Sequence, residues 1–303
     1  MATLRSTASL RADGYGGNEV ARMVRSAELL HLRRGAYLAE AEDLGELDRH
    51  RQLIAATLPL LAEDAVVSHT SAAVAHRLPL LGSPPARVEV TRSTASGGKR
   101  RGGVHLHVAK LPPAEVVDLD GLRVTSLART VVDLARSTPY EAAVVFGDAA
   151  LAAGLSSERL EASLELAARR PGIAAARRAV AALDGRSESP GESLSRIMLA
   201  TAGTPRPELQ HVVSDEAGSE VARCDFAWPE LGVLGEFDGR SKYGRLVLPG
   251  ESPGDAVFRE KLREDRLREL GWLMVRWIWA DLDHPTTVLR RLERAFSQGT
   301  RRL

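Results

Sequence analysis

Three carboxylates in the last third of the chain have the spacing of a divalent-cation site. Asp225 lies in one apolar segment, and Glu236 and Asp238 lie in the next. Side chains alternate across a strand, so Glu236 and Asp238 would point to the same face. Like charges this close repel, and burial would raise their pKa values. A hard cation such as Mg²⁺ or Mn²⁺ removes that cost, because carboxylate oxygens are its preferred ligands.

A fourth carboxylate, Glu192, opens a predicted helix that begins near Ser189. Glutamate in a first turn is favoured by the helix dipole alone, so this residue has a structural explanation as well. We expect Asp225 and Glu236 to hold one or two metal ions. Glu192 or Asp238 would complete the ligand set. A solvated acidic sheet face is the alternative to a metal site.

Two predicted strands joined by a turn must position these acids. Residues 221–228 read as the first strand, 229–232 as the turn and 233–239 as the second strand. Apolar residues flank the acids closely on both strands and would anchor the hairpin. They are Phe226, Trp228, Leu234 and Phe237.

These motifs resemble the PD-(D/E)xK core of restriction-endonuclease-like folds. The most similar pattern is that of domain-of-unknown-function family 559, which is related to the very-short-patch-repair endonucleases. The resemblance covers about residues 190–285 and implies hydrolysis of a phosphodiester by a metal-activated water. The matching segments are Asp225-Phe226, Glu236-Phe-Asp238-Gly239 and Gly271-Trp-Leu-Met-Val-Arg-Trp277.

One position departs from that pattern. Where the superfamily carries a lysine, two residues after the second acid, this chain has Asp238. A lysine there orients water and offsets charge on the leaving phosphate. Lys242 and Lys261 are the candidates to replace it, and Asp238 and Lys242 join the expected catalytic set. Arg263 and Arg266, on the buried side of a helix predicted over 258–270, are expected to meet the acidic cluster, a phosphate or a plain salt-bridge partner.

The aromatic residues and a polar linker divide the chain. All four tryptophans lie after residue 225, and residues 183–191 are polar and rich in turn formers. A second boundary is expected near residue 48, which predicts domains at 1–48, 49–183 and 184–303. Trp272, Trp277 and Trp279 could stack on nucleobases, or they could belong to the core.

The first domain reads as a small winged helix. Helices are expected over 6–12 and 19–25, the second capped by Asn18, followed by strands at 29–33 and 36–38. A recognition helix and a basic wing would reach phosphates and a DNA groove. The arginines expected at that surface are Arg22, Arg25, Arg33 and Arg34.

The middle domain is expected to be mixed α/β. Helices are predicted at 51–61, 68–76, 126–136 and 140–153, and strands at 87–91, 105–108 and 122–125. Four histidines in it, His69, His76, His105 and His107, suggest a metal site, because His105 and His107 share one strand face. His69 and His76 have no acidic partner at ligand spacing, which favours a structural role instead.

Residues 6–150 resemble the AbiEi antitoxin family of type IV toxin–antitoxin, phage-abortive systems. The resemblance implies a winged-helix DNA-binding head and autoregulation of an operon. A further possibility is that the middle domain binds a toxin or another protein partner. The matching segments are residues 32–38, 68–73 and 124–133.

The composition of the chain limits which functional classes of protein it can belong to. The net charge is +1, so any case for nucleic-acid binding must be local. A single cysteine, Cys224, excludes an intramolecular disulfide and a cysteine zinc cage, and reads as a buried small residue. No apolar run reaches the length of a membrane span, and the start lacks a secretory pattern, so the expectation is a cytoplasmic protein without a membrane partner.

The expected fold is therefore α/β, with a winged-helix head, a mixed middle domain and a restriction-endonuclease-like last domain. The expected function is a metal-dependent endonuclease that uses Mg²⁺ or Mn²⁺ and binds DNA. The alternative is an AbiEi-like antitoxin or transcriptional regulator whose nuclease fold is catalytically silent. The sequence leaves open DNA against RNA, sequence specificity and the oligomeric state.

Overall fold

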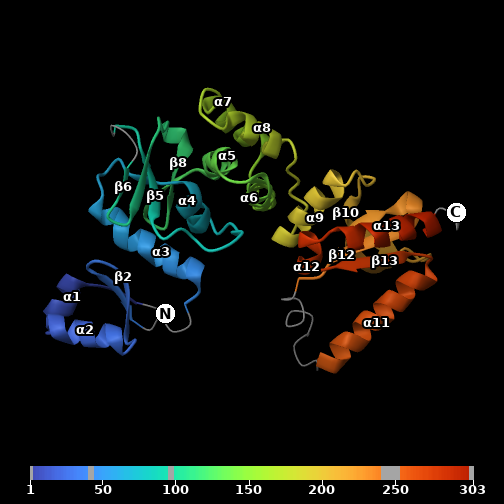
Figure 1. Cartoon of the computed structure of the whole chain (residues 1–303), viewed down its shortest axis with the longest axis horizontal. Helices are drawn as coiled ribbons and strands as arrows, with labels where there is room; N and C mark the ends of the chain where they lie inside the picture. Colours follow the sequence, from blue (N-terminus) through green and yellow to red (C-terminus); the bar gives the residue numbers. More distant parts are fainter. Residues whose placement is uncertain (1–2, 40–43, 95–98, 240–252, 300–303) are drawn as a thin grey trace. The chain divides into compact units, whose positions relative to one another are not determined.

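The computed structural model describes residues 3–39, 44–94, 99–239 and 253–299. The chain divides into two compact units, residues 1–183 and 184–303 (Figure 1). Both units combine helices with sheets, so the mixed α/β class is confirmed. The division falls at the start of the polar segment 183–191. Nowhere in the described ranges is there a helix with the length and apolarity needed to cross a bilayer.

The first unit begins with strand β1, followed by two short helices and two further strands, and the three strands form an antiparallel sheet. The sheet has the order β1-β3-β2, and Leu10, Val20 and Leu29 form its small core. The elements are β1 (Thr3–Ser6), α1 (Thr7–Ala12), α2 (Gly17–Arg25), β2 (Leu29–Arg33) and β3 (Ala36–Ala39).

The predicted N-cap at Asn18 is wrong. The helix α2 starts at Gly17, so Asn18 lies inside it and Gly16 is the N-cap. The backbone N–H of Gly16 donates to the Glu19 carboxylate at 2.7 Å. Glutamate three residues after the cap satisfies a backbone donor that would otherwise lack a partner, and this sets the helix start two residues earlier.

A six-stranded mixed sheet forms the centre of the first unit, in the order β6-β7-β5-β4-β9-β8. The pairs β5·β7 and β4·β9 are parallel, and the other neighbours are antiparallel. The strands are β4 (Val66–Val67), β5 (Val88–Arg92), β6 (Lys99–Arg101), β7 (Val104–Val108), β8 (Val116–Leu119) and β9 (Leu122–Thr125).

Helices cover this sheet, and α4 packs on β5 and β9. The helix predicted from residue 51 starts at Glu46, so the domain boundary predicted near residue 48 lies inside this helix. Acidic residues such as Glu46 and Asp48 are favoured in the first turn of a helix. The helices are α3 (Glu46–Thr57), η1 (Leu58–Leu60), α4 (His69–Ala75), η2 (Pro113–Glu115), α5 (Leu127–Ser137), α6 (Tyr140–Ala152), α7 (Ser157–Leu166) and α8 (Ile173–Val180).

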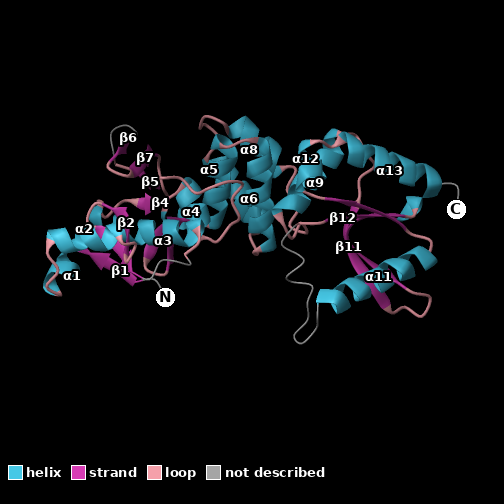
Figure 2. Ribbon diagram, turned by 60° about the horizontal axis from the view of Figure 1, so that its bottom comes forward, coloured by secondary structure: helices cyan, strands magenta, loops and turns pink. Residues whose placement is uncertain are grey.

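The second unit has a four-stranded sheet in the order β10-β11-β12-β13. The first three strands are antiparallel, and β13 runs parallel to β12. Helices α11 and α13 lie on opposite faces (Figure 2). The elements are α9 (Pro190–Thr201), β10 (Glu208–Ser214), β11 (Glu220–Trp228), η3 (Pro229–Leu231), β12 (Val233–Phe237), α11 (Pro253–Glu269), β13 (Leu273–Trp277), α12 (Trp279–Asp283) and α13 (Thr286–Gly299).

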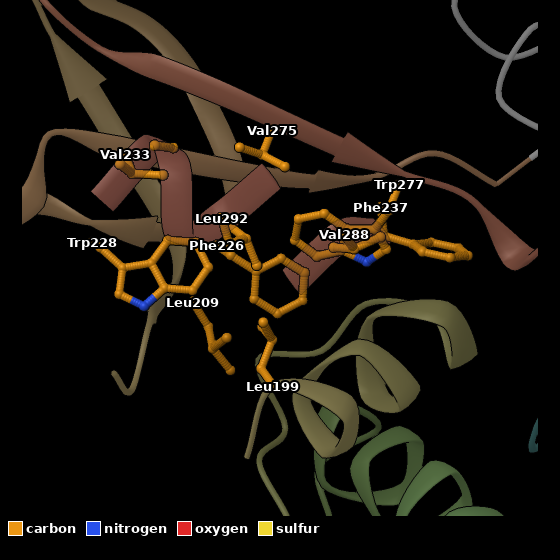
Figure 3. Packing of buried hydrophobic residues seen from close by; sticks show 11 residues of the cluster. Leu199, Leu209, Phe226, Trp228, Val233, Phe237, Val275, Trp277, Val288 and Leu292 are labelled. Atoms are coloured by element: carbon orange, nitrogen blue, oxygen red, sulfur yellow. The ribbon is translucent and has the colours of Figure 1, made fainter. Parts of the chain in front are cut away.

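The core of the second unit fills the space between its sheet and the helices α9 and α13 (Figure 3). The four apolar residues predicted to anchor the hairpin are all buried. Gly191 lets α9 approach the sheet, because a Cβ there would lie 1.9 Å from Cε1 of Phe237. The Trp277 indole N–H donates to Ser195 Oγ at 2.7 Å and ties β13 to α9.

Candidate functional site

Two of the predicted carboxylates lie on neighbouring strands. The antiparallel pairing of β11 with β12 runs from Trp228 opposite Val233 to Phe226 opposite Gly235, and Asp225 and Glu236 are the next residues of the two strands. Asp225 Oδ2 accepts a hydrogen bond from the backbone N–H of Phe237 at 2.8 Å. Both acids are half-buried. Asp225 and Glu236 therefore lie on adjacent strands, and the Phe237 amide ties the Asp225 side chain to β12.

Arginines neutralise the Glu236 carboxylate. Nη2 of Arg263, on α11, lies 2.8 Å from Oε1 of Glu236, and Nε of Arg276, on β13, lies 2.9 Å from Oε2. Glu260 of α11 pairs with both arginines. Burial acts to lower the pKa of Arg263, but its hydrogen bond to Glu260 and the charge of Glu236 raise the pKa above its usual range. Arg263 therefore contacts the acidic cluster, whereas Arg266, expected on the same buried side of the helix, is exposed and pairs with Glu269.

Glu192 lies in the first turn of α9, and its side chain is engaged locally. The backbone N–H of Glu192 donates to the side chain of the N-cap, Ser189, and Oε1 of Glu192 accepts from Ser189 Oγ at 2.7 Å. The other oxygen accepts from Gln210 Nε2 at 2.9 Å. Gln210 has a φ of 54°, a strained left-handed conformation for this residue.

The carboxylates of Glu192, Asp225 and Glu236 do not form a tight ligand group in the part of the chain that the structure describes. One group of three histidine, cysteine or acidic residues, with ligand atoms within 4.8 Å of one another, lies among the described residues, and these acids are not part of it. Glu192 is only 5% exposed and is held by α9 and β10. A metal at these residues stays a prediction.

The remaining predicted residues of this site differ in exposure. Asp238 follows β12 directly, is half-buried and donates its backbone N–H to Trp277 O at 2.8 Å. Lys242 lies outside the described residues, and Lys261 is exposed on α11. Trp277 is a core residue, whereas Trp279 is 41% exposed. Of these two tryptophans, Trp279 is the one open to stacking on a base.

Three of the four arginines predicted to contact DNA are open to solvent. Arg22 and Arg25 lie exposed on α2, and Arg34 is exposed in the turn between β2 and β3. Arg33 is only partly exposed, because its Nη1 donates to the carbonyl oxygen of Ala56 in α3 at 3.2 Å. Arg33 therefore connects the first sheet to α3.

A second group of chemically active side chains lies in the first unit. The parallel register of β5 and β7 pairs Glu89 with His105, and His107 lies two residues further on the same face. Oε1 of Glu89 is 3.2 Å from Nδ1 of His105 and 3.2 Å from Nε2 of His107. These three residues are a group whose ligand atoms lie within 4.8 Å of one another.

The neighbours of this group come from α4. The His69 ring stacks on His107, with 3.6 Å between ring centroids. The backbone N–H of Thr70 donates to the second carboxylate oxygen of Glu89 at 2.9 Å. His76 does not join, because its Nε2 lies 2.7 Å from the Thr125 carbonyl oxygen. His69, His105 and His107 therefore lie together, although the sequence favoured a structural role for these histidines.

Burial and charge set two pKa values here. Burial acts to raise the pKa of Glu89, but the hydrogen bond with His107, the nearby His69 and the Thr70 amide together lower it to about 2. Burial lowers the pKa of His69 to about 4. Glu89 is thus anionic and His69 neutral at pH 7.

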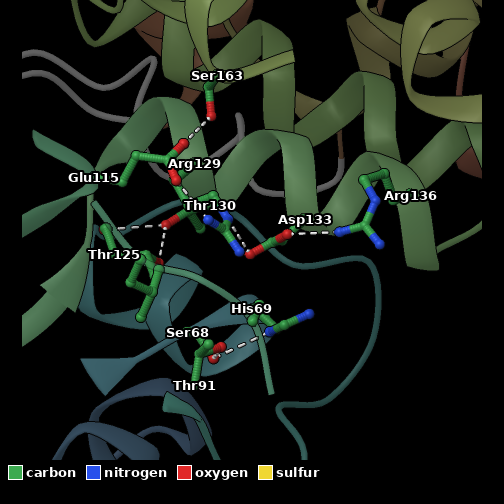
Figure 4. A network of polar contacts seen from close by, with 12 residues as sticks. Ser68, His69, Thr91, Glu115, Thr125, Arg129, Thr130, Asp133, Arg136 and Ser163 are labelled. Carbon is green, nitrogen blue, oxygen red and sulfur yellow. Dashed lines mark hydrogen bonds and ion pairs between the residues drawn. The ribbon is translucent and has the colours of Figure 1, made fainter. Parts of the chain in front are cut away.

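Two cavities open beside the histidines. One, of about 490 Å³, is lined by His69, His105 and His107 and by a charged wall. The other, of about 410 Å³, also contains Glu89. In the charged wall, buried Arg129 pairs with Glu115 and Asp133, and Arg136 pairs with Asp133 at 2.8 Å (Figure 4).

No family model matches the chain. Two relatives from two strains of Mycobacterium tuberculosis, named uncharacterized protein MT2308 and uncharacterized protein Rv2248, are each 31% identical over 209 residues. Each alignment covers 67% of this chain and 74% of the relative. The chain belongs to the family of these mycobacterial proteins. The crystal structure of RV2827C protein from M. tuberculosis overlaps with a TM-score of 0.38 at 16% identity, over 70% of this chain and 84% of that one, which is too slight a likeness for a fold assignment.

Sequence reasoning missed Glu89 as the acidic partner of the histidines. Glu89 lies 16 residues before His105 in the chain, and only the parallel pairing of β5 with β7 brings them together. The available signal was its place between Val88 and Val90, which are both buried. Because side chains alternate across a strand, Glu89 faces the side of the sheet opposite to Val88 and Val90. His105 and His107 face that same side from β7.

Proposed function

We propose that the second unit is a metal-dependent phosphodiester hydrolase acting on nucleic acid, with a restriction-endonuclease-like fold. The observation that supports this most is that Asp225 of β11 accepts a hydrogen bond from the backbone N–H of Phe237, the residue after Glu236 on the adjacent strand β12. Asp225 and Glu236 are both half-buried, and Glu236 forms ion pairs with Arg263 and Arg276. Carboxylates paired in this way suit Mg²⁺ or Mn²⁺, with Glu192 or Asp238 as a further ligand.

A bound metal would supply a water of lowered pKa and a positive charge on the phosphate. Asp225 is oriented for this by the Phe237 amide, which fixes one of its oxygens. Arg263 and Arg276 offer planar donors suited to a phosphodiester. Without a bound phosphate, both arginines hold the Glu236 carboxylate in place. A phosphate bound next to Glu236 would lie beside them.

The test is cleavage of supercoiled plasmid and of single-stranded DNA and RNA with Mg²⁺ or Mn²⁺. Wild type is compared with Asp225→Asn and Glu236→Gln, and the matched control is Glu230→Gln at an exposed glutamate of the same hairpin. We expect metal-dependent cutting by wild type and the control, with a loss of roughly 100-fold or more in both site variants. Cutting that survives both substitutions would reject the site.

A second candidate is a DNA-binding regulator of the AbiEi type with a silent nuclease fold. Both oxygens of Glu236 are already engaged by arginines, and Asp238 stands where the superfamily carries a lysine. The first 39 residues support this reading, because two helices lie between β1 and the β2–β3 hairpin of one three-stranded sheet, which suits a winged helix. Arg22, Arg25 and Arg34 would face the DNA.

The two candidates separate in one experiment. A regulator shifts DNA in a gel without cutting it under any metal, and its affinity is unchanged by Glu236→Gln. A toxin partner for the first unit would follow from the regulator reading and can be sought by co-purification with the products of neighbouring genes. If wild type neither binds nor cuts DNA, both proposals fail.

A further inference from the structure

We propose that Glu89, His105 and His107 form a binding site for a divalent transition-metal ion, with Zn²⁺ as the best match. This site is in the first unit and is independent of the acidic hairpin in the second. Its donor set is two imidazoles and one carboxylate, a combination that suits Zn²⁺ and other transition metals more than Mg²⁺.

The distances fit one ion bound by three ligands. Zinc lies about 2.0–2.2 Å from nitrogen and oxygen ligands, so in a tetrahedral site two ligand atoms are about 3.4 Å apart. Oε1 of Glu89 lies 3.2 Å from the ring nitrogens of both His105 and His107. Both of these oxygen–nitrogen distances are thus close to the ligand–ligand distance expected around a bound zinc ion.

The scaffold holds these ligands on regular structure. Glu89, His105 and His107 come from two adjacent parallel strands, and their registers fix which face they occupy. Glu89 is also anchored through its backbone, because its N–H donates to Ser71 Oγ at 2.9 Å. Ligands on strands vary less in position than ligands on loops, which favours a preorganised site.

Contacts around the ligands are of the kind that orient metal-binding side chains. The Thr70 amide holds the second oxygen of Glu89, so that Oε1 faces the histidines. His69 stacks on the His107 ring and limits its rotation. His69 itself has a φ of 51°, and such strained residues are concentrated at functional sites.

The ion would keep an open coordination position. Three protein ligands leave a fourth place for water or a ligand, as in zinc sites that carry out chemistry. His105 and His107 line both cavities, and each has about a quarter of its side chain exposed. The larger cavity is also lined by Arg136 and Arg170. Their positive charges would favour an anionic ligand at the open coordination position of the metal.

The experiment is zinc binding by the full chain, purified without a polyhistidine tag and stripped with a chelator. Binding is measured by competition with a chromogenic zinc chelator and by isothermal titration. Co²⁺ is used in parallel, because its absorption spectrum in the visible range reports tetrahedral coordination directly on wild type. We expect about one Zn²⁺ per chain and a tetrahedral Co²⁺ spectrum.

Variants assign the site. His105→Gln and His107→Gln are each expected to weaken Zn²⁺ binding by more than roughly tenfold and to remove the Co²⁺ spectrum. The control is His31→Gln, at an exposed histidine on β2, and Glu236→Gln tests whether zinc binds the second unit instead. Circular dichroism of each variant without metal establishes that it folds.

Either of two outcomes would overturn the proposal. One is a wild-type chain that binds no Zn²⁺ and gives no tetrahedral Co²⁺ spectrum. The other is binding that His105→Gln and His107→Gln leave intact, or that Glu236→Gln abolishes. Neither outcome depends on nuclease activity, so the zinc site can fail while the proposed function stands, and the reverse.

Discussion

Arg263 of α11 and Glu236 of β12 form an ion pair with 2.8 Å between Nη2 and Oε1. Both side chains are mostly withdrawn from solvent, at 23% and 16% exposure. Arg276 donates to the same carboxylate from β13. The pair therefore connects helix to sheet, and it also occupies the carboxylate that a catalytic metal would need. Each of these two roles leads to a different prediction.

The structural role predicts that Glu236→Gln destabilises the second unit by about 1–3 kcal/mol. The substitution leaves Arg263 and Arg276 with a weaker partner in a partly buried place. All four tryptophans lie in this unit, so their fluorescence during urea unfolding reports on it selectively. Glu230→Gln, at an exposed site, should leave the midpoint unchanged. Equal midpoints for all three proteins would mean that the ion pairs contribute nothing measurable.

The catalytic role predicts a competition between Arg263 and the metal for Glu236. Arg263→Gln should then raise the affinity of the second unit for Mn²⁺ by roughly tenfold, because the cation no longer has to displace a guanidinium. Electron paramagnetic resonance of free Mn²⁺ measures this directly. The control is Arg266→Gln, since Arg266 pairs with Glu269 on the exposed side of α11. Weaker Mn²⁺ binding in Arg263→Gln would contradict the competition.

The acidic hairpin of the second unit was predictable because its sequence signals are local, whereas β10 and α13 of the same unit were not predicted. The apolar residues around Asp225 and Glu236 predicted two strands and a turn, and they lie at β11 (Glu220–Trp228) and β12 (Val233–Phe237). The burial of Cys224 was also predicted, and burial raises the pKa of its thiol to about 12. Period-two alternation and turn residues carry this information within a few positions of each residue.

The first unit was less predictable because its important contacts are distant in sequence. Glu89 meets His105 and His107 only through a parallel pairing of strands that the chain does not connect directly. Short strands such as β4 (Val66–Val67) have too few residues to show a periodicity. The sequence places Arg33 at the tip of the predicted wing. Its hydrogen bond to the Ala56 carbonyl oxygen depends on the packing of α3, which the local sequence does not reveal.

Close packing at Gly191 gives a third prediction. A Cβ at this position would lie 1.9 Å from the Phe237 ring, so Gly191→Ala should lower the free energy of unfolding of the second unit by about 1–3 kcal/mol. Tryptophan fluorescence in urea measures the loss. The double variant Gly191→Ala with Phe237→Leu should recover part of it, because the smaller side chain makes room. Losses that simply add in the double variant would argue against the steric cause.

Buried His50 predicts acid sensitivity of the first unit. Burial lowers its pKa from 6.5 to about 4, with partial opposition from the charge of Glu89. The unfolded chain therefore binds more protons between about pH 6.5 and pH 4, so the stabilisation is complete above pH 6.5 and declines as the pH falls through this window. Between pH 7 and pH 5 the loss from His50 is about 2 kcal/mol.

The measurement is the free energy of unfolding in urea at pH 7 and pH 5. Unfolding is monitored by hydrogen exchange of the backbone amides of α3, which contains His50. His50→Gln keeps a group that can bond to Ser71 Oγ, to which His50 Nε2 lies 2.9 Å away. This variant should lose less stability than wild type between the two pH values. His31→Gln, at an exposed histidine, should behave like wild type. An identical pH dependence in His50→Gln would assign the acid sensitivity elsewhere.

The arginines of the head should divide into two functional classes. Arg22 and Arg25 are exposed on α2, so replacing both with alanine should weaken DNA binding and reduce the dependence of log affinity on log salt concentration by about two. Arg33→Ala should instead lower the stability of the head by about 1 kcal/mol, because its bond to the Ala56 carbonyl is lost. Arg159→Ala, at an exposed arginine on α7, is the matched control.

Fluorescence anisotropy with labelled duplex DNA over a salt series separates these classes. A folded Arg33→Ala protein should bind DNA as wild type does, since its guanidinium is directed to α3 and not to a phosphate. If Arg33→Ala reduces the salt dependence as strongly as Arg22→Ala, the arginine contacts DNA by giving up its bond to α3. If Arg22 and Arg25 can be removed without effect, the head does not dock through α2.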